Sequence, residues 1–357
     1  MIERYVVYGA GGVGKTTVAA ALAVALARRG TRTLVVTTDP ARRLADALAV
    51  APSAEVVPVP WCPGLDCYMP DARSTPRSVA AELLSGVPDA DALIRNPIFE
   101  LLCSGLAGVH ELATLASLGP RSAGYAAVVI DTAPSRHALE LVSLPGRIHA
   151  LLESKALQWL GRLAQRGNEA RGITQRLLDW GPRRLIERFE GAVGSSAVRD
   201  ALAVLGAITS IRPRLLETMR RAGDILTGPS TRHLVVLAPR PGAEQDARFF
   251  AEELAEVGLR PSHYLLNRIS AEVPSWANEL ANSPQLAPEL RDAVALAETE
   301  SKATVEAADR TAQVLSRMSA ESALVRIPMM PAATPSAVVA AVASHLGHVM
   351  LKPARAS

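Results

Sequence analysis

The sequence predicts an α/β fold in which a mostly parallel central sheet is flanked by helices and interrupted by a helical insertion subdomain. Short apolar runs rich in Val and Ile alternate with longer helical patterns, which is typical of a parallel sheet covered by helices on both faces. A glycine-rich loop follows the first of these runs and precedes an alanine-rich helical segment. Strand patterns are then absent from about residue 145 to residue 227, which predicts the insertion.

The composition is that of a packed globular protein of 357 residues, with 49% hydrophobic and 20% charged residues. This length accommodates one large domain with an insertion, or two ordinary domains. The net charge is only +3, no long basic block is present, and aromatic residues make up 4% of the chain. We therefore expect no nucleic-acid partner, because such partners are bound by basic grooves and stacked aromatic side chains.

The three cysteines, Cys62, Cys67 and Cys103, form no C-x-x-C pair. Neither a disulfide framework nor a zinc site is expected from this spacing, and an odd number of thiols fits a reducing compartment. The N-terminus has no charged and then apolar leader pattern, and no apolar run reaches the length of a membrane span. We expect a soluble cytoplasmic protein.

The glycine-rich loop begins directly after the apolar run Arg4–Tyr8. Its residues Gly9, Gly14, Lys15 and Thr16 satisfy G-x-x-x-x-G-K-[ST], in which backbone N–H groups and a helix N-terminus face a polyphosphate. Lys15 is expected to hold the β- and γ-phosphates, and the Thr16 hydroxyl is expected to bind Mg²⁺. The fold is therefore predicted to be that of a P-loop NTPase. The candidate nucleotide-binding residues of the loop are Gly11, Gly12, Val13, Gly14, Lys15, Thr16 and Thr17.

The same glycines leave a second interpretation open. Gly9, Gly11 and Gly14 also satisfy G-x-G-x-x-G, the fingerprint of folds that bind NAD or FAD. Asp39 lies near the position expected for the acid that binds a ribose in such folds. We favour the nucleoside triphosphate, because a dinucleotide site has no use for a lysine and a hydroxyl directly after the last glycine.

Two acidic residues directly follow β-branched runs that are typical of buried strands. Asp39 follows Thr33–Thr38, and Asp131 follows Ala126–Ile130. Residues at the carboxyl ends of parallel strands face the ligand crevice of an open α/β sheet. Asp39 then suits water activation, and Asp131 suits the Walker B position that reaches Mg²⁺ through water. The alternative, a helix cap, stays open for each acid.

The remaining patterns complete the alternation. Strands are predicted at Asp66–Met69, His233–Ala238, His263–Leu266 and Leu324–Ile327. Helices are predicted at Ala41–Leu48, within 76–118, at Glu244–Val257, within Ala287–Met318 and at Ser336–Met350. Residues 1–144 and 228–357 are expected to form the ATPase core, and residues 145–227 the inserted helical subdomain. Its apolar stripes, which include Leu157, Leu160, Ala164, Leu202, Leu205 and Ile208, are interpreted as packing between its own helices in preference to a client groove.

Taken together, these motifs resemble the family of the arsenite-pump ATPase and of the ATPase that targets tail-anchored membrane proteins, within the deviant Walker A class. The likeness runs along almost the whole chain, and five motifs in order are more specific than one loop. The motifs are the phosphate loop Gly11–Thr17, the first switch Thr38–Asp46, the second switch Asp131–His137, Asn267, and the adenine loop Ile327–Pro331.

The resemblance implies a role for each matching residue. Asp39 would polarise the attacking water, Thr16 would bind Mg²⁺, and Asp131 would support the metal's outer shell. Asn267 and Pro328 would contact adenine. The residues implied to belong to the two switches are Asp39, Pro40, Asp46, Asp131, Pro134 and His137. ATP and ADP are the implied nucleotides, bound by a dimer that closes around two of them and reopens after hydrolysis. The helical subdomain would then engage a protein client or a membrane partner.

Three features depart from the family pattern. Ala10 stands where the family has a lysine that reaches the phosphates of the other subunit. The paired cysteines that hold zinc at the dimer interface of the targeting ATPase have no counterpart, so no zinc is expected. Arg42 and Arg43 replace the family's His-Ser or His-Asn, and we hypothesise that either arginine supplies the missing positive charge. Solvated surface arginines are the plainer interpretation.

The expected function is that of a Mg²⁺-dependent ATPase whose nucleotide cycle closes and opens a dimer. The alternative is an ATP-binding subunit that hydrolyses poorly because of Ala10 and pairs with a related active chain. The partner is accordingly expected to be a second copy or a related ATPase. The cysteine pattern offers no three-thiolate arsenite site, so an arsenite-pump role gains little support.

Overall fold

The computed structural model describes residues 2–39, 41–105, 108–133, 140–155, 195–270, 287–318 and 321–351. The chain forms two compact units. Unit 1 consists of Met1–Met69, Ser122–Leu139 and Pro229–Ser357, and unit 2 of Pro70–Arg121 and Glu140–Gly228. This division differs from the expected one, in which the segment 70–121 belongs to the core.

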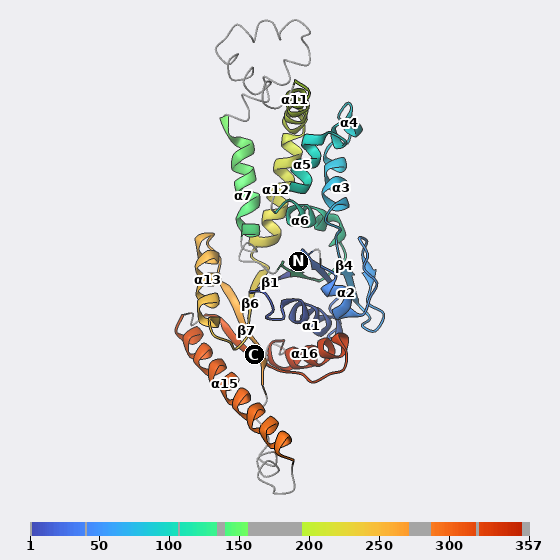
Figure 1. Ribbon diagram of the computed structural model, residues 1–357. Coiled ribbons are helices and arrows are strands. Elements are labelled where there is room, and N and C mark those ends of the chain that lie inside the picture. Colours follow the sequence, from blue (N-terminus) through green and yellow to red (C-terminus); the bar gives the residue numbers. More distant parts are fainter. Residues whose placement is uncertain are drawn as a thin grey trace, which may run out of the picture. The chain divides into compact units, whose positions relative to one another are not determined.

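Unit 1 is built on an eight-stranded sheet with the strand order β3-β4-β2-β5-β1-β6-β7-β8 (Figure 1). Neighbouring strands are parallel, except that β3 and β4 are antiparallel. The strands are β1 (Glu3–Tyr8), β2 (Thr33–Thr37), β3 (Val57–Pro58), β4 (Leu65–Tyr68), β5 (Ala127–Asp131), β6 (Thr231–Leu237), β7 (Pro261–Ile269) and β8 (Ala323–Pro328). The predicted mostly parallel sheet is confirmed. The two-residue strand β3 was not predicted, because it lies in a Pro-rich connection.

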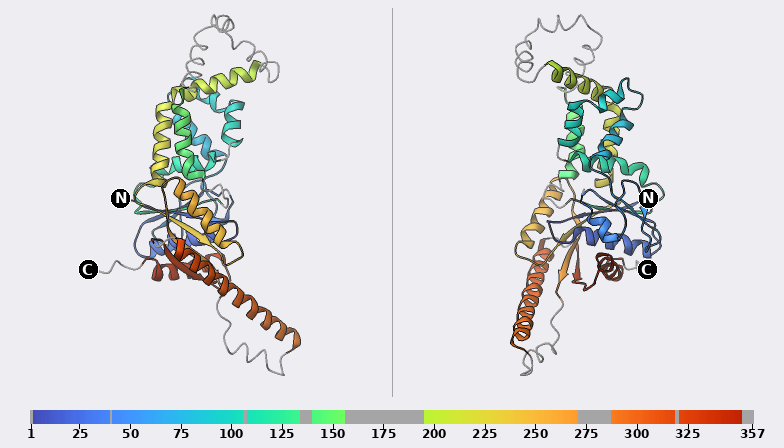
Figure 2. Two further views of the ribbon diagram at one scale, coloured as in Figure 1. Left: turned by 90° about the vertical axis from the view of Figure 1, so that its left-hand side faces the viewer. Right: turned by 45° about the vertical axis from the view of Figure 1, so that its right-hand side comes forward.

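Helices cover both faces of this sheet. Helix α1 (Lys15–Arg28) is buried from Val18 to Ala27, and its alanines let it lie close to the strands. It packs with α2 (Arg43–Leu48) and α16 (Pro335–Val349) against one face. On the other face, the Tyr8 ring lies 6.4 Å from that of Phe250 in α13 (Ala243–Glu256). Helix α15 (Pro288–Met318) lies beside α13 (Figures 1 and 2).

Among its described residues, unit 2 contains helices joined by short connections, and no strand. Its helices are α3 (Ser74–Leu83), α4 (Ala90–Ile94), α5 (Pro97–Gly105), α6 (Val109–Arg121), α7 (Glu140–Glu153), α11 (Ser195–Ser210) and α12 (Arg212–Thr227). Helix α12 packs against α6 and α7, while α11 packs against α4 and α5. Helices α4, α5 and α6 of segment 70–121 therefore contact the later helices of unit 2, which explains why the segment belongs there.

Part of the predicted insertion lies outside the described residues. Leu157, Leu160 and Ala164 fall there, as does the side chain of Leu202. Leu205 and Ile208 lie on α11 and are partly buried. No helix in the described ranges is long and apolar enough to cross a lipid bilayer.

Arginines at the start of α12 bind the ends of neighbouring helices. The Arg212 Nε donates to the carbonyl oxygen of Leu152 at 2.8 Å, near the end of α7. The Arg214 Nη1 donates to the carbonyl oxygen of Ser85 at 2.5 Å and to that of Leu83 at 3.2 Å, just after and at the end of α3. Carbonyls at helix C-termini lack partners within their own helix, so these arginines satisfy them.

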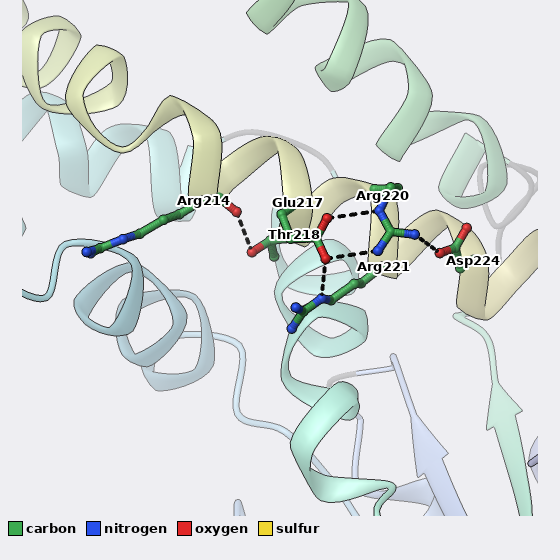
Figure 3. Close-up of polar contacts among 6 residues, drawn as sticks. All are labelled: Arg214, Glu217, Thr218, Arg220, Arg221 and Asp224. Carbon is green, nitrogen blue, oxygen red and sulfur yellow. Dashed lines mark hydrogen bonds and ion pairs between the residues drawn. The ribbon is translucent and has the colours of Figure 1, made fainter.

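Further along α12, charged side chains form a chain of ion pairs on the surface (Figure 3). Glu217 accepts hydrogen bonds from Arg220 at 2.9 Å and from Arg221 at 2.7 Å, and Arg220 also donates to Asp224 at 2.6 Å. The hydrogen bonds from the two arginines lower the pKa of Glu217 to about 2. These pairs are exposed to water, so they support the helix only weakly.

Candidate active site

The phosphate loop connects β1 to α1, and its backbone requires glycine at several positions. Gly9, Gly12 and Gly14 have φ angles of 154°, 78° and 91°, which residues with a Cβ rarely adopt. A Cβ added at Gly9 would lie 2.4 Å from the carbonyl oxygen of Val236, and one added at Gly14 would lie 2.4 Å from Nδ2 of Asn267. The loop thus lies tightly against β6 and β7.

Lys15 is the first residue of α1, and its side chain points back along the loop. It is 5% exposed, and its Nζ donates to the carbonyl oxygen of Ala10 at 3.1 Å. Burial lowers the pKa of its ammonium group, while the nearby carboxylates of Asp131 and Asp39 act in the opposite direction. The amine is therefore held under the loop with two acids close enough to influence its charge.

Asp131, the last residue of β5, is fully buried below the loop. Its Oδ2 accepts a hydrogen bond from the Thr37 hydroxyl at 3.1 Å, and its Oδ1 has no partner among the described residues. Burial raises the pKa of this carboxyl to about 6, opposed by hydrogen bonds from Thr16 and Thr37 and by the charge of Lys15. An orphan acceptor at this position is the kind of group that a hydrated metal ion satisfies.

Asp39 follows β2, and both of its carboxylate oxygens have a partner close in sequence. Its Oδ1 accepts from the backbone N–H of Ala41 at 3.0 Å, which closes a turn ahead of α2 but does not cap that helix. Its Oδ2 lies 3.4 Å from Nη1 of Arg43. The side chain is 9% exposed and faces the cavity described below. The turn therefore fixes the carboxylate at the edge of the cavity, with Arg43 beside its second oxygen.

Lys15 and Asp39 line a cavity of about 370 Å³ in unit 1, and the buried Asp131 precedes Thr132, which also lines it. Its lining residues are Gly12, Gly14, Lys15, Thr16, Thr17, Asp39, Arg43, Asp46, Ala47, Thr132, Arg268 and Pro335. The N-terminus of α1, the Lys15 amine, the Thr16 hydroxyl and the orphan oxygen of Asp131 fit a magnesium nucleotide. A larger cavity of about 670 Å³, between the start of α13 and α15, contains no phosphate-loop residue.

Residues from β7 hold the opposite side of the loop. The Asn267 Nδ2 donates to the carbonyl oxygen of Val13 at 2.9 Å, and the Arg268 Nη1 donates to that of Gly12 at 3.0 Å. Arg268 has a φ of 64°, in the left-handed region, where the pairing of β7 with β8 is irregular. Arg268 was not among the predicted site residues, and its only signal in the sequence is its place next to Asn267. Pro328 ends β8 and is absent from the cavity lining, where Pro335 is found instead.

Comparison with known proteins agrees with this geometry. Residues 3–190 match the family of anion-transporting ATPases. The chain belongs to this family. A similar protein is the arsenical pump-driving ATPase of Acidiphilium multivorum, which is 25% identical over 76% of this chain and 40% of its own length.

Other relatives are similar to shorter or longer parts of this chain. An uncharacterised protein of Streptomyces coelicolor is 30% identical over 77% of the chain and 65% of its own length. The ATPase GET3C of Arabidopsis thaliana is 32% identical over 40% of the chain and 41% of its own length. The chain thus spans 40% to 65% of the length of the relatives named here.

The switch residues predicted from the resemblance are only partly described. Asp39 and Asp46 line the cavity, and Asp131 lies below it. Three others, Pro40, Pro134 and His137, lie outside the described residues. In the described ranges, no group of three or more His, Cys, Asp or Glu side chains is arranged to hold a metal. A magnesium ion that takes most of its ligands from phosphates and water does not require such a group.

We expect the stability of the nucleotide-free protein to depend on the ionisation of Asp131. Folded Asp131 keeps its proton up to about pH 6, whereas its ordinary pKa is 3.8. The folded state therefore binds more protons between these values, so the free energy of unfolding falls as pH rises through this window, by up to about 3 kcal/mol. When urea unfolding is measured from pH 4 to pH 7 without Mg²⁺, the free energy of unfolding should fall less for Asp131→Asn than for the wild type. If the free energy of unfolding changes equally with pH in the two proteins, the raised pKa of Asp131 is contradicted.

A second prediction concerns Arg268. Both Arg268→Ala and Arg268→Gly remove the hydrogen bond to Gly12, so we expect each to weaken ADP binding by about 5- to 20-fold, measured by titration calorimetry. Glycine also relieves the strain of the left-handed backbone conformation, whereas alanine does not. The glycine variant should therefore be more stable than the alanine variant by about 0.5–1 kcal/mol. The surface variant Arg260→Ala is a control, since Arg260 pairs only with exposed Glu321 among the contacts seen. Unchanged ADP binding in both Arg268 variants would contradict the prediction.

Proposed function

We propose that this chain is a Mg²⁺-dependent ATPase. The observation that carries the proposal is the convergence of three residues on one cavity, Lys15, Thr16 and Asp39, with the buried carboxylate of Asp131 close enough to act on the Lys15 amine. A dinucleotide site would gain nothing from this set. Phosphoryl transfer uses each of them, because it depends on holding the phosphates, holding the metal and orienting a water.

The residues divide these tasks according to where they lie. Lys15 would give up its hydrogen bond to Ala10 and donate to the β- and γ-phosphates. Thr16 would bind Mg²⁺ through its hydroxyl, and Asp131 would accept hydrogen bonds from metal-bound water through its orphan oxygen. The bound ion would neutralise charge on the phosphoryl oxygens. Asp39, fixed by the N–H of Ala41, would orient and polarise the attacking water.

The test is ATP hydrolysis by the purified chain with and without Mg²⁺. We expect Mg²⁺-dependent turnover in the wild type and a loss of about 10²–10⁴-fold in Asp39→Asn, with ATP still bound, because the amide cannot accept a proton. Binding of NAD more tightly than ATP, measured in the same titrations, would overturn the assignment in favour of the dinucleotide interpretation.

A second candidate is an ATP-binding subunit that hydrolyses poorly and pairs with a related active chain. The alanine at position 10 favours it, because a methyl group cannot donate to a phosphate. Comparing turnover of the wild type with that of Ala10→Lys separates the two candidates. A wild type that turns over ATP as fast as the lysine variant rejects the second.

We also propose that the nucleotide cycle closes and opens a dimer, a homodimer or a heterodimer with a related ATPase, and that unit 2 handles a protein client or a membrane partner. Two apolar side chains of unit 2, Leu101 and Leu151, are 63% and 59% exposed. We place the protein in the reducing cytoplasm, where its three free cysteines would stay unpaired. Purifying proteins that remain bound to Asp39→Asn with ATP would identify the client.

A further inference from the structure

The nucleotide cavity holds more positive charge than the phosphate-loop motif supplies. Three cationic side chains line it among the described residues: Lys15, Arg43 and Arg268. Lys15 belongs to the motif, and Arg268 donates to Gly12 on the β7 side of the loop. Arg43 comes from α2, on the side where β2 brings in Asp39. Its position therefore places a cation next to the proposed water-orienting acid.

Arg43 is held loosely. Its Nη1 lies 3.4 Å from Oδ2 of Asp39, and its side chain is 59% exposed. An ion pair with this exposure is weak, so exchanging it for another anion costs little. The positive charge of Arg43 also acts on Lys15, whose pKa it lowers. Arg43 is thus within electrostatic range of the amine that is expected to hold the terminal phosphates.

The neighbouring Arg42 does not line the cavity. It precedes α2, and its carbonyl oxygen accepts the N–H of Asp46 at 3.1 Å. Its side chain is exposed and is absent from the cavity lining. The two adjacent arginines therefore differ in the one respect that matters here, which is access to the site. Arg42 gives a control with the same chemistry, one residue away.

We propose that Arg43 binds the γ-phosphate of ATP within its own chain and so supplies the positive charge that Ala10 cannot. The inference rests on the ATPase function proposed above and adds a residue that the phosphate-loop motif does not contain. A guanidinium group suits this task because it can donate two parallel hydrogen bonds to phosphoryl oxygens. When Arg43 turns to the phosphate, it leaves Asp39, whose Oδ2 becomes available to the attacking water.

The first experiment compares Arg43→Ala with Arg42→Ala by equilibrium titration with Mg·ATP and Mg·ADP, alongside steady-state hydrolysis. Arg43→Ala is expected to bind ATP at least about 10-fold more weakly while ADP affinity stays within about twofold, because only ATP carries the γ-phosphate. Turnover is expected to fall about 10³-fold, the range of an arginine that stabilises the transferring phosphoryl group. Arg42→Ala should match the wild type in all three measurements.

A second experiment asks whether Arg43 contacts the phosphate or acts only through Asp39. The ATP and ADP titrations are repeated with Asp39→Asn and with Asp39→Asn combined with Arg43→Ala. If Arg43 binds the γ-phosphate, its removal still lowers ATP affinity about 10-fold in this background. Loss of the effect there would overturn the proposal and leave Arg43 as a partner of Asp39 alone.

The outcome also separates this inference from the proposed function. If the wild type binds and hydrolyses ATP and Arg43→Ala behaves like Arg42→Ala, the inference fails and the ATPase function stands. If the wild type binds neither nucleotide, the proposed function fails and the inference falls with it. Arg43→Lys keeps the charge but not the paired donors, so we expect ATP affinity between those of the wild type and the alanine variant.

Discussion

Replacing Lys15 by alanine is expected to abolish ATP turnover and to weaken Mg·ATP binding by about 10²–10³-fold. Lys15 is 5% exposed, and within the described part of the chain its ammonium group has only the Ala10 carbonyl as a hydrogen-bond acceptor. Two charge-assisted hydrogen bonds to phosphate oxygens contribute about 3–4 kcal/mol, which corresponds to that loss of affinity. Equilibrium titration with Mg·ATP and a phosphate-release assay measure the two effects.

The control must separate lost binding from lost folding. Lys15→Met keeps most of the buried stem and removes the charge, so it should fold like the wild type and still fail to bind ATP. Lys302→Ala removes a lysine whose side chain is 70% exposed and pairs with Glu298 on α15, so it should bind ATP normally. ATP binding by Lys15→Met within threefold of the wild type would refute the assigned role of the amine.

The convergence of Lys15, Asp39 and Asp131 could be predicted from the sequence because each depends on a local rule. The loop motif fixes Lys15 at a helix N-terminus, and the two β-branched runs end at the same edge of a parallel sheet. The structure has β2 beside β5 and β5 beside β1, so the residues that end these strands are neighbours. Local patterns were enough because residues that end parallel strands lie at the same edge of the sheet, so their positions in the sequence predict which of them are close in space.

The division into units could not be predicted in the same way. The sequence of segment 70–121 predicts helices between two strands. Such helices can equally cover the sheet or belong to a separate helical unit. Which of the two occurs depends on contacts with α7, α11 and α12, which come much later in the chain. The role of Arg268 was hidden for a similar reason, since it depends on a left-handed backbone conformation that sequence patterns rarely indicate for arginine.

The pairing of Asp39 with Arg43 illustrates a third limit. The sequence suggested two adjacent arginines as candidates and gave no reason to prefer one. The structure separates them, because α2 begins at Arg43 and directs this side chain toward Asp39, four residues earlier. The choice between neighbouring residues therefore depends on the residue at which the helix begins, and helix ends are the least predictable part of a sequence pattern.

Replacing Gly9 by alanine is expected to destabilise the nucleotide-free protein by roughly 3 kcal/mol or more. The added Cβ would meet the carbonyl oxygen of Val236 at 2.4 Å, and Gly9 has a φ of 154°. The obstacle is the backbone of β6, which pairs directly with β1, so the clash cannot be relieved by moving a side chain. Either the central strands separate or the loop shifts, and both disturb fully buried packing around Val6 and Val7.

Gly11→Ala is the matched control for this prediction. A Cβ at Gly11 meets nothing within 4 Å, and Gly11 is not among the residues with positive φ, so we expect a change of less than about 0.5 kcal/mol. Equilibrium urea unfolding without nucleotide measures both variants. Equal stability of the two would mean that the first residue of the loop tolerates a side chain, and β1 and β6 would then have to be farther apart at this point than the contact with Val236 requires. A large loss in Gly9→Ala alone would instead identify the contact between the loop and β6 as the feature that sets the loop's shape before any phosphate arrives.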